Sequence, residues 1–78
     1  MVTVHLFAAA RAAAGQSELQ LEATTMESLK EQLVSLNLEM QRIIPQCSYL
    51  LNGIACQDFS DLLKSGDQVD VLPMFAGG

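Results

Sequence analysis

An amphipathic helix over residues 24–36 is the feature that most constrains the fold of this chain. The segment TTME at residues 24–27 fits a capping box, in which two side chains satisfy free backbone amides at a helix start. A chain of 78 residues lies near the lower limit for unaided folding, so its best helix has to cover the core. We therefore expect the apolar stripe of this helix to pack across a sheet. The stripe consists of Met26, Leu29, Leu33 and Leu36.

Three further segments have the side-chain alternation of β-strands. Residues 17–22 alternate leucine with glutamate and glutamine, which is typical of a half-exposed strand. Residues 68–72 are the last strand, and Pro73 ends it because proline lacks a backbone N–H group. Residues 2–7 are expected to form the first strand. Its two faces alternate: one consists of Val2, Val4 and Leu6, and the other of Thr3, His5 and Phe7.

The remaining segments are short. Residues 8–14 are rich in alanine and precede Gly15, which predicts a short helix with a glycine stop. Residues 37–45 suggest another helical turn, ended by Pro45. Residues 47–51 and 54–56 are expected to form a hairpin around Asn52-Gly53, the strongest two-residue turn signal. A turn is expected at residues 64–67, and a helical turn at residues 58–63 that buries Phe59, Leu62 and Leu63.

This order of elements predicts an α+β fold with one mixed sheet of four to five strands, one main helix across it and short helical turns. The first and last strands are apolar enough to be central neighbours, and if paired they run parallel. That arrangement is the β-grasp, or ubiquitin-like, fold. We expect residues 1–73 to form the β-grasp domain and residues 74–78 to form a flexible C-terminal diglycine tail projecting from a central strand.

Composition and charge narrow the classes of function. A net charge of −5 argues against nucleic-acid binding and is compatible with solubility alone or with a basic partner. The sequence has no basic leader and no apolar run long enough for a membrane span, so we expect a cytoplasmic protein that does not bind membranes. Cys47 and Cys56 are expected to be free thiols, although a hairpin leaves a bridge between them open.

No catalytic constellation is present. His5 has no cysteine or carboxylate at ligand spacing, so no metal site is expected, and the glycines form no phosphate-binding loop. We therefore do not expect an enzyme that acts alone. The chain ends in Ala76-Gly77-Gly78, a slender terminus suited to entering a narrow space. Conversion of the Gly78 carboxylate to an acyl-adenylate would allow sulfur to be captured there, and the chain would then be a carrier.

Several motifs together resemble the ubiquitin-like sulfur carriers, and among these the small subunits of molybdopterin synthase. The resemblance spans nearly the whole chain, and its individual pieces are weak. The anchors are the opening VHLFAAAR at residues 4–11, then Gly15, Leu51-Asn52-Gly53, the segment GDQV at residues 66–69, Pro73, and the terminal Gly77-Gly78.

The resemblance implies partners and a reaction. A ubiquitin-activating-enzyme-like adenylyltransferase would use ATP to adenylate Gly78, and a sulfurtransferase would supply the sulfur of a thiocarboxylate. The loaded tail would enter the large subunit of molybdopterin synthase, in a heterotetramer of two small and two large subunits. Sulfur would pass there to cyclic pyranopterin monophosphate in molybdenum cofactor biosynthesis. No cofactor is expected on this chain alone.

The resemblance also assigns roles to residues. Gly78 is adenylated and then carries the sulfur, and Gly77 provides clearance for tail passage. Phe7, Arg11 and Leu72 match positions that contact partners, although Phe7 also fits ordinary sheet core and Arg11 a solvated helix residue. Met74 and Phe75 depart from the family pattern, and Phe75 either needs room in the partner's channel or anchors at its mouth.

Three other functions stay open. The sulfur carriers of thiamin thiazole synthesis commonly end in Ala-Gly-Gly, but usually lack the Phe-Ala-x-x-Arg opening and the helix after it. A ubiquitin-like protein modifier would join Gly78 to lysines of target proteins. A plain interaction module would keep its function after deletion of Gly77 and Gly78.

Overall fold

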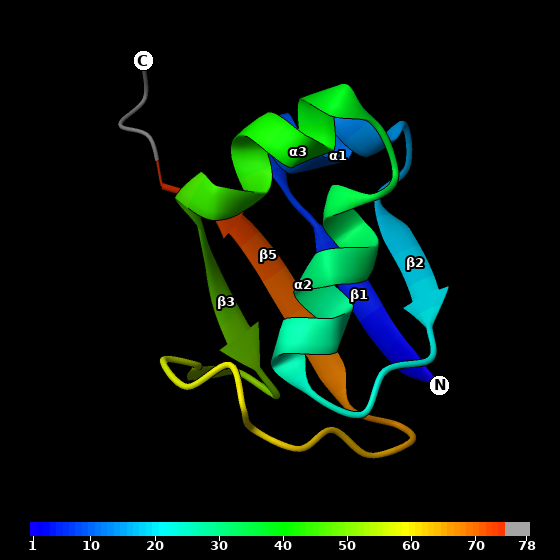
Figure 1. The fold of residues 1–78 in the computed structure, drawn as a ribbon, viewed down its shortest axis with the longest axis vertical. Helices are drawn as coiled ribbons and strands as arrows, with labels where there is room; N and C mark the ends of the chain where they lie inside the picture. Colours follow the sequence, from blue (N-terminus) through cyan, green and yellow to red (C-terminus); the bar gives the residue numbers. More distant parts are fainter. Residues whose placement is uncertain (75–78) are drawn as a thin grey trace.

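The computed structural model describes residues 1–74 of the chain. Five strands form one mixed sheet in the order β2-β1-β5-β3-β4, which confirms the predicted β-grasp arrangement (Figure 1). The strands are β1 (Val2–Leu6), β2 (Glu18–Leu21), β3 (Cys47–Leu51), β4 (Ile54–Ala55) and β5 (Gln68–Pro73). The helices are α1 (Ala8–Ala14), α2 (Met26–Val34), α3 (Leu38–Ile43) and the 3₁₀ turn η1 (Ile44–Gln46).

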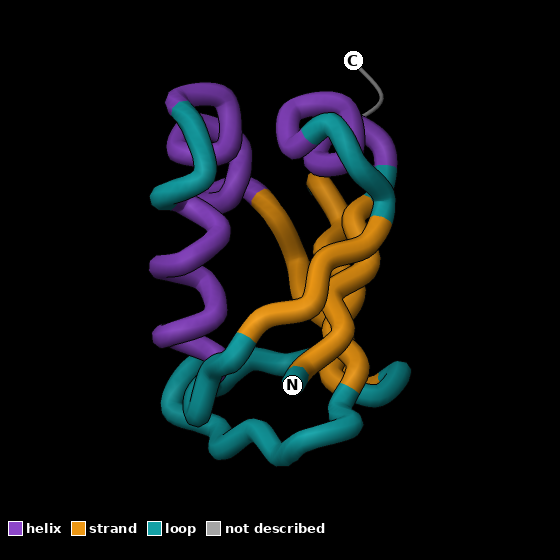
Figure 2. The backbone as a smooth tube through the Cα atoms, turned by 90° about the vertical axis from the view of Figure 1, so that its right-hand side faces the viewer, coloured by secondary structure: helices purple, strands orange, loops and turns teal. Residues whose placement is uncertain are grey.

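The first and last strands are parallel neighbours at the centre of the sheet, as the sequence predicted. Their register pairs Thr3 with Gln68 and Leu6 with Val71. Because both strands run in the same direction, their carboxyl ends meet at one end of the sheet. Helices α1 and α3 lie at that end, and α2 lies along one face of the sheet (Figures 1 and 2). Within residues 1–74 no helix covers the opposite face, which is called the free sheet face below.

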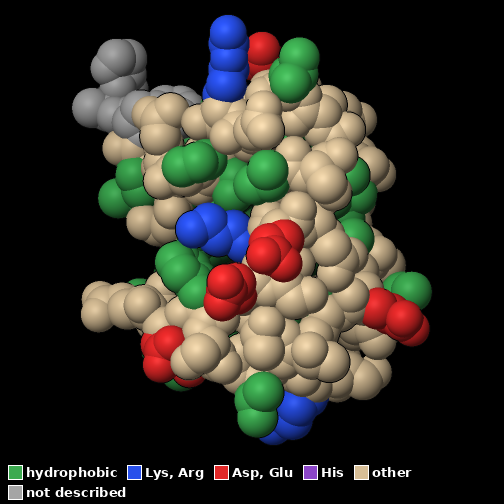
Figure 3. Space-filling view, viewed as in Figure 1, with side chains coloured by type: hydrophobic (Ala, Val, Ile, Leu, Met, Phe, Trp, Pro, Cys, Tyr) green, Lys and Arg blue, Asp and Glu red, His purple; other side chains and the backbone are tan. Residues whose placement is uncertain are grey.

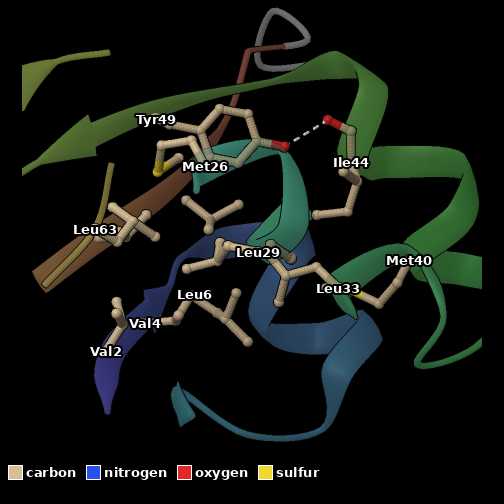
Figure 4. Close-up of a cluster of buried hydrophobic side chains, with 13 residues drawn as sticks. Val2, Val4, Leu6, Met26, Leu29, Leu33, Met40, Ile44, Tyr49 and Leu63 are labelled. Atoms are coloured by element: carbon tan, nitrogen blue, oxygen red, sulfur yellow. Dashed lines mark hydrogen bonds between the residues drawn. The ribbon is translucent and has the colours of Figure 1, made fainter. Parts of the chain in front are cut away.

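The core lies between the sheet and α2 (Figure 4). Tyr49 is buried there, and its hydroxyl donates a hydrogen bond of 3.0 Å to the carbonyl of Ile44. Burial raises the pKa of the Tyr49 phenol. The stripe of α2 contributes Met26, Leu29 and Leu33 to the core, whereas Leu36 lies beyond the end of the helix and is 43% exposed. The sheet contributes chiefly Val2, Val4, Leu6, Val69 and Val71.

Two local turn predictions are confirmed. Gly15 follows α1 with a left-handed φ of 77°, and its N–H group donates to the carbonyl of Arg11. Asn52 and Gly53 join β3 to β4 with φ angles of 51° and 82°. Two consecutive positive φ angles characterise the type I′ turn, whose twist suits a hairpin and which asparagine and glycine adopt most readily.

The start of α2 differs from the prediction by one residue. Thr25, and not Thr24, is the N-cap, and its hydroxyl accepts from the N–H group of Ser28 at 3.1 Å. The N–H groups of Met26 and Glu27 donate to the carbonyls of Asp61 and Phe59, at 3.1 and 2.7 Å. Backbone carbonyls of residues 59 and 61, far from α2 in the sequence, therefore bind amides of its first turn, a task that we had expected the capping box to perform.

The helical turn expected at residues 58–63 is wrong. The segment contains one tight turn, in which the N–H group of Asp61 donates to the carbonyl of Asp58 at 3.1 Å, but it forms no helix, and the carbonyls at positions 59 and 61 accept from the first residues of α2. Leu63 is buried and Phe59 packs edge-to-face against Tyr49 at 5.5 Å, as expected of core residues. Leu62, which was also expected to be buried, is 77% exposed.

Candidate functional site

The terminal residues assigned to sulfur carriage lie outside the described part of the chain. This applies to Phe75, Gly77 and Gly78, and so to most of the tail proposed for residues 74–78. What the structure defines is the point from which they continue. Met74 follows β5, is 64% exposed, and donates its N–H group to the carbonyl of Gln46 at 3.1 Å. Pro73 is in register with Cys47, so the chain is held up to position 74.

Phe7 and Leu72 come together beside this point. Phe7 continues β1 in an extended conformation and is the N-cap residue of α1. Its N–H group donates to the carbonyl of Val71 at 3.2 Å, which places Phe7 beside Leu72 of the neighbouring strand. Strand alternation puts both side chains on the free sheet face, because Leu6 and Val71 are buried on the other.

The exposure of Phe7 distinguishes a residue of the sheet core from a residue that is accessible to a partner. The residue is 42% exposed, so it does not belong to the core, and Leu72 is half-buried. Exposed aromatic side chains such as phenylalanine are enriched in protein–protein interfaces. The pair Phe7 and Leu72 is called the apolar end of the free sheet face below.

Arg11 lies one helical turn from this apolar end. It is exposed on α1, and its N–H group donates to the carbonyl of Phe7 at 3.4 Å. Within residues 1–74 its guanidinium makes no ion pair. The structure thus places Phe7, Leu72 and Arg11 at the same end of the molecule as Met74, from which the tail continues.

Sequence reasoning missed the polar part of the free sheet face. His5 on β1 pairs in register with Glu18 on β2 and with Asp70 on β5. Its Nδ1 atom lies 3.9 Å from an Oε atom of Glu18. The alternation of residues 2–7 placed His5 opposite the core, but the partners of His5 depend on the register of three strands, which no local pattern gives.

The two cysteines are free, as the sequence analysis favoured. Burial raises the pKa of the Cys47 thiol, and this thiol donates to the carbonyl of Ile43 at 3.2 Å. Burial also raises the pKa of the Cys56 thiol, with a smaller opposing effect from a hydrogen bond to the backbone of Asp58. Thiols with raised pKa values are protonated near neutral pH, so neither cysteine is an activated nucleophile.

The described residues hold no group of three or more His, Cys, Asp or Glu side chains arranged to bind a metal ion. None of the helices in residues 1–74 has the length and apolar character needed to cross a bilayer. Close to Met74 the structure thus presents an apolar pair, an exposed arginine and a neighbouring polar row.

Comparison with known proteins gives a family and a set of similar folds. The model described as the ThiS family matches residues 4–78. No curated protein sequence matches the chain. A solved structure of small archaeal modifier protein 1 from Methanosarcina acetivorans is 26% identical, with 99% of this chain and 95% of that chain covered and a TM-score of 0.86.

Two chains from solved complexes are also similar. One belongs to the complex of subunits 1 and 2 of molybdopterin-converting factor from Helicobacter pylori, with 22% identity, coverage of 99% of this chain and 97% of that chain, and a TM-score of 0.77. The other belongs to the Amycolatopsis orientalis BexX/CysO complex, with 19% identity, full coverage of both chains and a TM-score of 0.78. At such identities these two likenesses show a shared fold, whereas the family match runs through the terminal glycines.

Proposed function

Because this chain belongs to the ThiS family of ubiquitin-like sulfur carriers, we propose that it carries sulfur as a thiocarboxylate on Gly78 and donates it as the small subunit of molybdopterin synthase. The observation that carries this proposal is the family match through Gly77 and Gly78, combined with an apolar docking pair beside the residue from which the tail continues. The protein would act in the cytoplasm together with a large subunit, and the pterin precursor would bind there.

The chemistry requires activation by a second protein. One oxygen of the Gly78 carboxylate attacks the α-phosphorus of ATP on an adenylyltransferase, which forms the acyl-adenylate and releases pyrophosphate. A sulfur nucleophile supplied by a sulfurtransferase then displaces AMP from the Gly78 carbonyl carbon. Where this nucleophile is the outer sulfur of an enzyme persulfide, a further thiol attacks the inner sulfur of the resulting acyl disulfide, forms a disulfide with the donor enzyme and leaves a thiocarboxylate on Gly78. This chain contributes the carboxylate, its presentation and the docking surface.

The geometry around Met74 suits delivery of the terminus into another protein. The four residues after Met74 span about 14 Å when extended, at roughly 3.4 Å per residue. Met74 is anchored by its hydrogen bond to Gln46, so a partner bound at Phe7 and Leu72 would receive a terminus of defined length. Gly77 lacks a Cβ atom and would leave the narrowest part of a channel free for the reacting carbonyl.

The molybdopterin role is favoured over thiazole synthesis by the opening of the chain. Phe7 and Arg11 lie in the segment that resembles the small subunits of molybdopterin synthase, and helix α1 follows Phe7 in the structure. The subunit from Helicobacter pylori shares this fold over almost its whole length. A protein modifier is the second candidate, because the small archaeal modifier protein has a high structural similarity and comparable coverage.

Intact mass analysis of the protein purified from its own cells tests the carrier role. We expect a fraction in which one oxygen is replaced by sulfur, with fragmentation placing the change at Gly78. Protein linked through Gly78 to lysines of other polypeptides would instead support the modifier. The Gly78→Ala variant is the matched control and should lack the sulfur-bearing species.

Reconstitution with the large subunit from the same cells distinguishes the two carrier pathways. The thiocarboxylated chain should convert cyclic pyranopterin monophosphate to molybdopterin, which is detected as its fluorescent oxidation product. A loaded chain that transfers no sulfur to this precursor, but does so with a thiazole synthase, would contradict the molybdopterin assignment and retain the carrier role.

A further inference from the structure

One row of side chains crosses all five strands on the free sheet face. The register places Glu18 of β2 beside His5 of β1, and His5 beside Asp70 of β5. Asp70 in turn pairs with Leu50 of β3, and Leu50 with Ala55 of β4. Adjacent strands lie about 4.8 Å apart, so the backbones that carry the two carboxylates are separated by about 10 Å, with the imidazole between them.

The two acidic residues of this row, Glu18 on the edge strand β2 and Asp70 on the central strand β5, flank His5, and the strands carry no lysine or arginine. Glu18 and His5 have side chains that are 54% and 32% exposed, so solvent or a partner reaches both. The five strands contain no basic residue other than His5. The lysines and arginines of the chain lie on helices or in the turn before β5: Arg11, Lys30, Arg42 and Lys64.

The other side of the molecule differs in its charge pattern. On the side that bears α2, basic and acidic side chains occur next to one another (Figure 3). There Glu27, Lys30 and Glu31 follow one another along α2, and the Nζ atom of Lys30 lies 4.4 Å from the centre of the Phe59 ring. Within the five strands the fixed charges on the free sheet face are therefore the two carboxylates Glu18 and Asp70, and Arg11 on α1 lies next to its apolar end.

We infer that the free sheet face binds a protein surface that carries an arginine or lysine over His5, between Glu18 and Asp70, beside an apolar patch over Phe7 and Leu72. Asp70 and Leu72 are two positions apart on one strand, so the basic group lies about 7 Å from the apolar contact. A guanidinium presents five donors in a planar fork and suits a site flanked by two carboxylates. Complementary charge of this kind raises association rates and selects among partners.

A second copy of this chain is a poor occupant of the same surface. In a symmetric dimer each free sheet face would meet another free sheet face, and Glu18 and Asp70 would face strands that contain no lysine or arginine. Like charges placed opposite one another oppose association. The occupant is therefore a different protein, with basic groups of its own.

The adenylyltransferase from the same cells is the partner for the test. This choice rests on the proposed function only in its need for activation of Gly78, which the sulfur carrier and the protein modifier share. The test variant combines Glu18→Gln with Asp70→Asn, which keeps the shape of both side chains. The matched control combines Glu27→Gln with Glu31→Gln on α2, and it removes the same charge from the other side of the molecule.

Binding kinetics measured by biolayer interferometry at low and high salt give the outcome, with amide spectra to verify that each variant is folded. We expect the test variant to raise Kd by about tenfold at low salt, mainly through slower association, and to flatten the salt dependence. The control variant should change Kd by less than about twofold.

Each result decides a different statement. Equal Kd values for the test variant and the unaltered chain, with tight binding retained, would overturn this inference and leave the carrier function standing. A larger loss in the control variant would place the acidic docking surface on α2 and would also overturn it. Absence of both binding and adenylation of the unaltered chain would contradict the proposed function, and with it the inference.

Discussion

Phe7 and Leu72 lie side by side at the carboxyl ends of β1 and β5, although one is near the start of the chain and the other near its end. The parallel pairing of the two strands produces this placement, because it brings both carboxyl ends to the same edge of the sheet. The same pairing places Met74 there. One feature of the topology therefore brings the apolar end of the free sheet face and Met74 together.

Leu72→Asp should weaken binding of the large subunit by at least about tenfold, which corresponds to about 1.4 kcal/mol. The substitution places a charge in a contact that is expected to lose its water on binding. Leu62→Asp is the control, because Leu62 is 77% exposed in the loop beside the start of α2. Isothermal titration calorimetry measures both variants, and an unchanged Kd for Leu72→Asp would rule out the apolar end as the docking site.

Leu33→Ala should lower the free energy of unfolding by about 2–5 kcal/mol, because it opens a cavity in the core under α2. Leu33 is fully buried. Leu36→Ala removes the same atoms from a side chain that is 43% exposed, so a much smaller loss is expected. Urea unfolding followed by circular dichroism measures both variants. Equal losses of unfolding free energy would show that the difference in burial between Leu33 and Leu36 does not determine their contributions to stability.

Asp67 should make the stability of the protein depend on pH in acid. Its carboxylate accepts from the N–H group of Lys64 at 2.8 Å and from the Asn52 amide at 3.1 Å. These hydrogen bonds, the first of them foremost, hold the pKa of Asp67 below its usual value. A lowered folded-state pKa means that the contribution is fully present above the unfolded pKa and is lost as pH falls through the folded pKa.

Asp67→Asn should therefore destabilise the protein at pH near neutral, and the difference from the unaltered chain should shrink as the medium becomes strongly acidic. Denaturant unfolding over a pH series measures this convergence. Asp70→Asn is the control, since the Asp70 side chain makes no hydrogen bond within residues 1–74. A difference that stays constant at every pH would show that the Asp67 charge is not the cause.

Deletion of Gly77 and Gly78 should abolish adenylation and sulfur transfer and leave the denaturation midpoint unchanged. The two residues lie beyond the anchored Met74, and a chain end without large side chains adds little burial. Adenylation is followed by pyrophosphate release, and stability by urea unfolding. A clear fall in the midpoint would mean that the terminus contributes to the folded domain.

The local elements of this fold were predictable because short-range chemistry decides them. The alanine run before Gly15 forms α1 with the predicted ends, and Asn52-Gly53 forms the predicted turn. In both cases the backbone has a positive φ angle, which glycine and asparagine adopt more readily than other residues. The parallel pairing of the first and last strands was also inferred, from their apolar character and the crossover between them.

The loop at residues 58–63 was mispredicted for a non-local reason. Its apolar spacing fits a helical turn, but the start of α2 supplies better-placed donors for the carbonyls of Phe59 and Asp61. The same contact displaced the capping box at Thr24. The free amides at the start of a helix can donate hydrogen bonds to the free carbonyls of a distant loop, and the spacing of residues in the sequence does not reveal such a pairing.

The sequence by itself determined the β-grasp class of fold, the identity of the core residues on α2 and the central strands, and the glycine terminus that suggested a carrier. Only the tertiary structure decided that Phe7 is exposed, that it neighbours Leu72, and that Glu18, His5 and Asp70 form one row. The physical reason is that alternation along a strand fixes which face a side chain occupies, whereas register between strands fixes its neighbours. Register is set by the packing of the whole sheet.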